Sequence, residues 1–323
     1  MSATLQQIAQ RIKQANGVVI CTHMRPDGDA FGSSLALSCA LEYLKIPHQV
    51  CVETEIPSNL KFINGIEKVK KYPDINYDLM VLVDCADEQR LGLLHDEFLS
   101  TKRKKIDTIN IDHHVSNTRY ATYNYVMDCA ANCMNVAALI DELGAPLDKR
   151  AAEYLMIGLL TDSGNFAHDD VNEQVFLLAA KLVKTGIDIR YLNDMLFKKQ
   201  PHQRAALYAE TMRGMRYFLD RRFACIVITQ ENMNKYGADN GMTEGFVDFP
   251  LSVDGVEVAA SIMEVKKRQY KVSLRSKEYV NVNKIAGVYG GGGHVRAAGC
   301  MLFGEIEEIL DKLTYTVSQY LED

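Results

Sequence analysis

Four clusters of acidic and histidine side chains in the first half of the chain could support metal-dependent chemistry. They are His23-Met-Arg-Pro-Asp27-Gly-Asp29, Asp84-Cys-Ala-Asp87, Asp112-His113-His114 and Thr161-Asp162-Ser163. Each cluster alone has an ordinary explanation, because a single Asp after a strand often caps a helix, as Asp29 before Ala30 could. Together they are harder to explain, since crowded carboxylates repel one another unless cations neutralise them. A metal site is the simplest interpretation.

The types of ligand in these clusters narrow the choice of metal and of reaction. Imidazole and carboxylate groups without thiolates favour Mn²⁺, Fe²⁺, Co²⁺ or Mg²⁺ over structural Zn²⁺. The number of ligands is sufficient for two cations. Two cations roughly 3.5–4 Å apart generate hydroxide from water at neutral pH and clamp a phosphoryl group for in-line displacement. The clusters therefore predict phosphoester hydrolysis.

The elements around the clusters indicate how they could meet. Short apolar runs at residues 18–21, 49–52, 79–83 and 108–111 predict buried strands, with a helix over 30–44 between the first two. Strands that alternate with helices predict an α/β fold with a mostly parallel sheet flanked by helices. The first three clusters each follow a predicted strand. Because the carboxyl ends of parallel strands share one edge of a sheet, we expect these clusters to converge there.

The periodicity changes further along the chain. Residues 135–186 show helical spacing, and a polar stretch at 197–203 marks a domain boundary. Beyond it, residues 223–229, 256–263 and 270–274 predict strands of a second, mixed sheet. A glycine-rich loop at 290–293 and a terminal helix follow. We expect a catalytic metal-binding domain over 1–190, a linker and connecting helix over 191–214, and a smaller α/β substrate-binding domain over 215–323.

Composition restricts the class of protein. The chain has 323 residues, with 36 Lys and Arg against 42 Asp and Glu and a net charge of −6. This acidic balance disfavours a long nucleic-acid track and favours a short polyanionic substrate. No apolar run reaches the roughly 18 residues of a membrane span, and no secretory signal is recognisable. The eight cysteines form no C-x-x-C pair, which is typical of reduced thiols and a cytoplasmic location.

The sequence resembles a known family, the DHH phosphoesterases, which also include RecJ-type exonucleases and family II pyrophosphatases. The resemblance rests on the histidines and aspartates of the four clusters, in the family's order. A second motif, Gly-Gly-Gly-Gly-His-Val-Arg-Ala-Ala-Gly over residues 290–299, is similar to the signature of the DHH-associated C-terminal domain. The two motifs together cover nearly the whole chain. The resemblance implies a DHH domain, a substrate-binding domain, and an active site in the cleft between them.

The resemblance also implies a role for each position. One metal would be held by His23, Asp27 and Asp84. The other metal would be held by Asp29, Asp84, His113 and Asp162, with Asp84 bridging the two. As the second catalytic group beside Asp84, His114 would face the scissile phosphate and neutralise its charge or protonate the leaving oxygen. Asp112 and Asp87 would orient imidazoles and bound water. For Asp87, a helix cap is an equally good explanation.

The substrate-binding candidates lie in the second half. Gly291, Gly292 and Gly293 could form a nest of N–H groups for a phosphate, with a plain tight turn as the alternative. His294 and Arg275 could grip a non-reacting phosphate. Arg296 is a weaker candidate. The run Lys266-Lys267-Arg268 is typical of a hairpin turn, with an accessory nucleic-acid contact as the minor alternative.

The family offers several activities. The short acidic chain and the pairing of motifs favour the nanoRNase type. Such enzymes cut short oligoribonucleotides and dinucleotides such as pApA to 5′-mononucleotides. The resemblance implies two divalent metal ions for this reaction, with Mn²⁺ as the favoured ion. Phosphoadenosine phosphate 3′-phosphatase activity is a further implied activity. Cyclic-di-AMP phosphodiesterase and RecJ-like single-strand exonuclease are alternatives, and a non-catalytic nucleotide sensor is the alternative of another class. The resemblance is compatible with a homodimer.

Two further features bear on the substrate. The resemblance implies a Ser/Thr-rich turn after an acidic residue, and this sequence has the segment 128–133 at that place. This loop could touch substrate. The chain has no tryptophan, so stacking on a base would use Phe, Tyr, His or Arg. Phe166 and His168, just past Asp162, are candidates.

Overall fold

The computed structural model describes residues 2–321. The chain forms two compact units, the first ending at Lys199 and the second starting at Gln200, and each is described by itself. Among the described residues, no helix combines the length and the apolar character that a membrane crossing would need.

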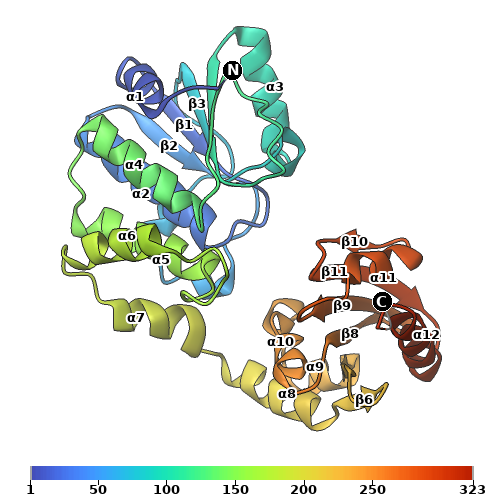
Figure 1. Ribbon diagram of the computed structural model, residues 1–323. Coiled ribbons are helices and arrows are strands. Elements are labelled where there is room, and N and C mark those ends of the chain that lie inside the picture. Colours follow the sequence, from blue (N-terminus) through green and yellow to red (C-terminus); the bar gives the residue numbers. More distant parts are fainter. Residues whose placement is uncertain (1, 322–323) are drawn as a thin grey trace. The chain divides into compact units, whose positions relative to one another are not determined.

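The first unit is built on a five-stranded parallel sheet (Figure 1). Its strands run in the order β2-β1-β3-β4-β5, and they span Val18–Cys21 (β1), His48–Cys51 (β2), Leu79–Val83 (β3), Asp107–Asp112 (β4) and Tyr123–Val126 (β5). The four predicted strands are confirmed. Strand β5 was not predicted, because it is a short, partly exposed edge strand without an apolar run.

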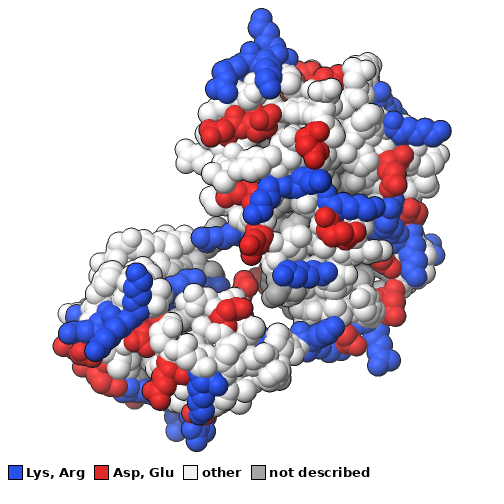
Figure 2. Space-filling model, turned by 180° about the vertical axis from the view of Figure 1, so that it is seen from behind, with Lys and Arg blue, Asp and Glu red and all other residues white. Residues whose placement is uncertain are grey.

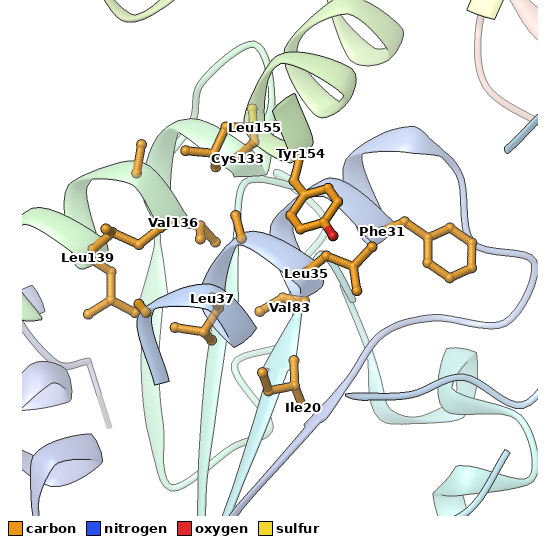
Figure 3. Packing of buried hydrophobic residues seen from close by; sticks show 14 of the residues in the cluster. Ile20, Phe31, Leu35, Leu37, Val83, Cys133, Val136, Leu139, Tyr154 and Leu155 are labelled. Carbon is orange, nitrogen blue, oxygen red and sulfur yellow. The ribbon is translucent and has the colours of Figure 1, made fainter. Parts of the chain in front are cut away.

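Helices cover both faces of this sheet. They are α1 (Leu5–Lys13), α2 (Gly28–Tyr43), α3 (Leu94–Lys104), α4 (Asn132–Leu143), α5 (Lys149–Asp162), α6 (Glu173–Val183) and α7 (Ile189–Asn193). Side chains of α2, α4 and α5, such as Leu35, Val136 and Leu155, pack over Ile20 of β1 and Val83 of β3 (Figure 3). On the opposite face α3 contributes Phe98 to a smaller cluster. The sheet is therefore buried on both sides, which accounts for its continuous apolar strands.

The second unit has a mixed six-stranded sheet in the order β10-β11-β9-β8-β7-β6. The strands are β6 (Arg216–Phe218), β7 (Phe223–Ile228), β8 (Val258–Lys266), β9 (Gln269–Ser276), β10 (Gly292–Gly293) and β11 (Ala297–Phe303). The helices are α8 (His202–Arg213), α9 (Gln230–Tyr236), α10 (Asp248–Ser252), α11 (Val282–Val288) and α12 (Ile306–Ser318). The three predicted strands and the hairpin turn after Lys266 are confirmed. Strand β11 was missed, because it follows the glycine-rich loop directly.

Candidate metal centre

The strand order of the first unit creates one point where ligands converge. After β1 the chain crosses to β2 on one side, whereas after β3 it crosses to β4 on the other. The carboxyl ends of β1 and β3 therefore flank a crevice, the usual ligand site of such sheets. Three groups of residues with potential ligand atoms form there, and the ligand atoms of one group lie within 4.8 Å of one another. The groups are His23, Asp27 and Asp84; Asp29, His113 and Asp162; and Asp84, Asp112, His113 and His114.

Asp84 belongs to two of these groups. Its Oδ2 is 3.5 Å from Nε2 of His23, and its Oδ1 is 3.4 Å from Nε2 of His113. The Oδ1 atom is buried and has no hydrogen-bond partner among the described residues. A buried carboxylate oxygen without a partner is costly. Cations shared with the two imidazoles would satisfy it, so the residues fit a metal centre.

Both imidazoles are oriented for metal binding by main-chain carbonyls. Nδ1 of His23 donates to the carbonyl of Met24, and Nδ1 of His113 donates to the carbonyl of Cys129, each at 2.8 Å. These bonds place a proton on Nδ1 and leave Nε2 directed toward Asp84, where its lone pair would bind a cation once this nitrogen has lost its proton. Imidazole ligands of metals are usually held in this way.

Asp29 is anchored by a helix that starts about a hundred residues later in the chain. Its fully buried carboxylate accepts hydrogen bonds from the main-chain N–H groups of Asn132 and Cys133, the first two residues of α4. The first N–H groups of a helix lack partners within the helix and carry partial positive charge. The alternative explanation, that Asp29 caps α2, does not apply, because the N-cap is Asp27, which accepts from the N–H groups of Asp29 and Ala30.

This contact also explains part of the unusual segment 128–133. Its carbonyl at Cys129 fixes His113, and its last two N–H groups hold Asp29. The main chain of the segment thus supports two of the predicted ligands. Main-chain contacts of this kind leave no side-chain signature, so the sequence offered no signal for them.

Burial and repulsion keep protons on several groups of the centre. Burial and the charge of Asp84 raise the pKa of Asp29 to about 7. Burial and the charges of Asp29 and Asp84 raise the pKa of Asp162 to about 10. Burial alone would raise the pKa of Asp84, but the imidazoles of His113 and His23 hold it well below its usual range. Burial would lower the pKa of His113, but the nearby carboxylate of Asp84 raises it to about 10.

His114 is held through one ring nitrogen, Nδ1, by the carboxylate of Asp112, and this leaves its other ring nitrogen, Nε2, free. Its Nδ1 donates to Oδ1 of Asp112 at 2.8 Å, and the Asp112 carboxylate is completely buried. The amide of Asn117 donates to Oδ2 of Asp112 and to Oδ1 of Asn110. Asn110 in turn donates to the carbonyls of Leu82 and Cys85 around the end of β3. Neither asparagine was predicted, since a lone Asn carries no distinctive spacing.

Asp87 lies outside the three groups of ligand atoms. Its carboxylate accepts from the N–H groups of Gln89 and Arg90 and caps the 3₁₀ turn Glu88–Leu91. The structure therefore assigns Asp87 the alternative role of a cap.

The predicted substrate-binding residues lie in β9 and β10 of the second unit and directly beside β10. Arg275 is in β9 rather than after it, opposite Ala297 of β11, and its guanidinium donates to the carbonyl of Leu274. Gly292 of β10 pairs with Gly299 of β11. A side chain at Gly291 would place its Cβ 2.2 Å from the carbonyl oxygen of Gly299, so close strand packing requires this glycine.

His294 and Arg296 lie next to the glycine-rich loop. His294 is exposed, at the turn between β10 and β11. Arg296 is exposed, and its guanidinium donates to the carbonyls of Val280 and Glu278, so it ties the turn after β10 to the segment 278–280.

Comparisons with known proteins agree with both halves of this description. Residues 17–159 match the profile of the DHH family, N-terminal domain, and residues 222–323 match the DHHA1 domain. The chain is 31% identical to the bifunctional oligoribonuclease and PAP phosphatase NrnA of Thermus thermophilus, over 98% of this chain and 94% of the relative. It is 28% identical to a probable protein of the same name from Streptococcus mutans, over 95% and 96% of the two chains.

A solved structure is similar to this protein over nearly the whole chain. The exopolyphosphatase-related protein from Bacteroides fragilis is 26% identical, with a TM-score of 0.90 over 98% of this chain and 96% of that one. RecJ of Thermus thermophilus, at 13% identity and a TM-score of 0.56, shares the fold over 98% of this chain but 54% of its own.

Proposed function

The chain belongs to the DHH family of phosphoesterases, and on that premise we propose that it hydrolyses short oligoribonucleotides and dinucleotides such as pApA to 5′-mononucleotides. The observation that carries the proposal is the position of Asp84, which belongs to two of the imidazole–carboxylate groups and has one buried oxygen without a hydrogen-bond partner among the described residues. The names of the relatives from Thermus thermophilus and Streptococcus mutans support a short-RNA substrate and a second activity as a PAP phosphatase.

In this proposal two divalent cations are bound by residues of the first unit. His23, Asp27 and Asp84 would hold one, and Asp29, Asp84, His113 and Asp162 would hold the other. When bound, the cations supply a nucleophile from water at neutral pH and neutralise charge on the phosphoryl group. We propose Mn²⁺ for both positions, with Mg²⁺, Co²⁺ or Fe²⁺ as the alternatives, because imidazole and carboxylate donors without thiolates suit these ions.

His114 is the proposed proton donor to the leaving oxygen. Asp112 holds its Nδ1, so Nε2 is the atom that can carry the transferred proton. The Asp112 carboxylate is itself fixed by Asn117. A donor fixed in this way keeps one tautomer and one orientation, which are conditions for efficient general-acid catalysis.

The second unit is proposed to set the length of the substrate. Arg275, His294 and the N–H groups of Gly291, Gly292 and Gly293 would bind the phosphate at the far end of a short strand. We propose the division into a catalytic domain over 1–190, a linker over 191–214 and a substrate-binding domain over 215–323. On the face shown in Figure 2, cationic and anionic side chains are interspersed. That mixture favours short substrates over a long electrostatic track.

A cytoplasmic location is part of the proposal. All eight cysteines, which lie within the described residues, are free thiols. Free buried thiols are typical of proteins in reducing compartments.

The decisive experiment is the release of mononucleotide from a series of 5′-labelled RNAs, from dimers to long strands, with and without Mn²⁺. The series should include pApA, phosphoadenosine phosphate and cyclic-di-AMP. We expect Mn²⁺-dependent activity that is confined to the shortest linear members. Equal activity on long strands would replace the proposal with single-strand exonuclease activity. His294→Ala should raise KM on dinucleotides, and an unchanged KM would contradict the proposed phosphate contact.

A further inference from the structure

Two phenylalanines that follow Asp162 in the chain form a stacked pair, in which Phe166 is partly buried against the hydrophobic core. The ring centroids of Phe166 and Phe176 are 5.5 Å apart, and their planes differ by 25°. Phe166 follows α5, and Phe176 lies in the first turns of α6, a helix that packs against α5. The Phe176 side chain is 55% exposed. The pair thus presents the aromatic ring of Phe176 to solvent.

The loop that carries Phe166 begins at Asp162, a predicted metal ligand. Three successive residues, Gly164, Asn165 and Phe166, have positive φ angles of 56°, 58° and 66°. A bulky residue rarely adopts this left-handed conformation, and such strain is often found at functional sites. The N–H of Phe166 donates to the Ser163 hydroxyl at 3.0 Å, which holds the turn.

A histidine completes the loop. Nδ1 of His168 donates to the main-chain carbonyl of Asp162 at 2.7 Å, and the His168 side chain is exposed. A Cβ on Gly164 would lie 2.3 Å from Nε2 of His168, so this ring is packed directly over the turn. The loop therefore holds an imidazole and the phenylalanine pair in fixed positions relative to Asp162.

We propose that the Phe166–Phe176 pair is a platform on which a base of the substrate stacks beside the scissile phosphate, with His168 next to it. The inference rests on the proposed function, because it concerns how the same substrate is positioned. Stacking on aromatic rings suits an enzyme that accepts many sequences, since every base offers a flat face. The chain has no tryptophan, so phenylalanine supplies the surface.

The test is a double-mutant type of cycle, in which the Phe176 ring, one base of the substrate, or both are removed. KM and kcat are measured on pApA and on two analogues that each lack one adenine, with the protein as isolated and with Phe176→Ala. Removing the base that stacks should raise KM about 5- to 150-fold for the unaltered protein. The same removal should have little effect in Phe176→Ala, and Phe176→Tyr should restore the difference. An equal response of Phe176→Ala and the unaltered protein to both analogues would overturn the proposal.

Binding provides a readout that is independent of turnover. Calorimetry with the Mn²⁺-loaded protein should show that AMP binds more tightly than ribose 5-phosphate, and that Phe176→Ala removes the preference. Equal affinities of the unaltered protein for the two ligands would overturn the platform. Absence of hydrolysis of every short RNA would instead overturn the proposed function, and the AMP preference would still report on the platform.

Two controls separate positioning from packing. Tyr43 is 58% exposed and ends α2, about 20 Å along the helix from Asp29. Tyr43→Ala should change neither KM nor the AMP preference. A thermal unfolding curve for Phe176→Ala reports any structural effect. A loss of stability without a change in the response to base removal would show that the pair serves packing alone, and would overturn the proposal.

Discussion

The carboxylate of Asp29 accepts a 2.9 Å hydrogen bond from the main-chain N–H of Cys133, the second residue of helix α4. This contact joins residues 104 positions apart in the sequence. The helix terminus stabilises a buried negative charge at a point where other carboxylates repel it. Asp162, proposed to bind the same cation, is more exposed, with 24% of its side chain accessible, and it faces His113.

The two carboxylates should therefore respond differently to amide substitution. Asp162→Asn is expected to stabilise the metal-free protein by about 1 kcal/mol, because the amide is neutral without the proton that burial and Asp29 force onto the Asp162 carboxyl. Asp29→Asn is expected to destabilise it by about 1–3 kcal/mol, because an amide NH₂ would face a main-chain N–H. Both variants should lose Mn²⁺-dependent activity. Denaturant unfolding of the metal-free proteins measures the difference, and a shift in the same direction for both would contradict this account.

The stability of the metal-free protein should fall as the pH rises from about 5 to about 9. The pKa values of Asp29, Asp162 and His113 are raised to about 7, 10 and 10, so the folded protein holds protons that the unfolded chain releases. Stability falls with pH wherever the folded state binds more protons. Thermal unfolding without metal, at several pH values, tests the direction.

Mn²⁺ should reverse this trend. Its binding requires deprotonated carboxylates and neutral imidazoles, so it releases protons and becomes tighter as the pH rises. The increase in Tm caused by Mn²⁺ should therefore be larger at pH 8 than at pH 6. A Tm increase that is independent of pH would indicate that the ion binds somewhere other than this centre.

His114 and Asp112 should act as one unit in catalysis. His114→Ala is expected to lower kcat about 10²–10⁴-fold with little change in KM, the usual effect of losing a general acid. Asp112→Asn should also lower kcat, because it disturbs the bond that fixes the tautomer of His114. The double variant should be no slower than His114→Ala alone. Multiplicative losses would show that Asp112 acts independently.

The glycine-rich loop offers a matched pair of substitutions. Gly291→Ala should destabilise the protein by about 1–3 kcal/mol, because the new Cβ would lie 2.2 Å from the Gly299 carbonyl oxygen. Gly292→Ala should change stability by less than about 0.5 kcal/mol, since the nearest atom, Oδ1 of Asn283, would be 3.7 Å away. Chemical denaturation compares the two. Equal tolerance of both substitutions would mean that β10 can move away from β11.

Local patterns were sufficient to predict much of the fold. Apolar runs identified β1, β3 and their neighbours, because a strand buried on both faces must be apolar throughout. The acidic and histidine clusters after these strands were predicted to meet, since parallel strands end at one edge of their sheet. His23 and Asp84 are 61 positions apart in the sequence, and Nε2 of His23 lies 3.5 Å from Oδ2 of Asp84 at this edge.

The sequence by itself thus determined the order of the elements, the types of ligand and the edge of the sheet at which they gather. The tertiary structure alone decided which groups support them. The N–H groups of α4 reach Asp29, Asn117 reaches Asp112, and Phe176 of α6 meets Phe166 in the loop after α5. The first contact depends on how distant segments pack, the other two depend on how the chain turns back after β4 and after α5, and main-chain donors are present at every non-proline residue. No local pattern distinguishes the few donors and rings that the fold brings to the site.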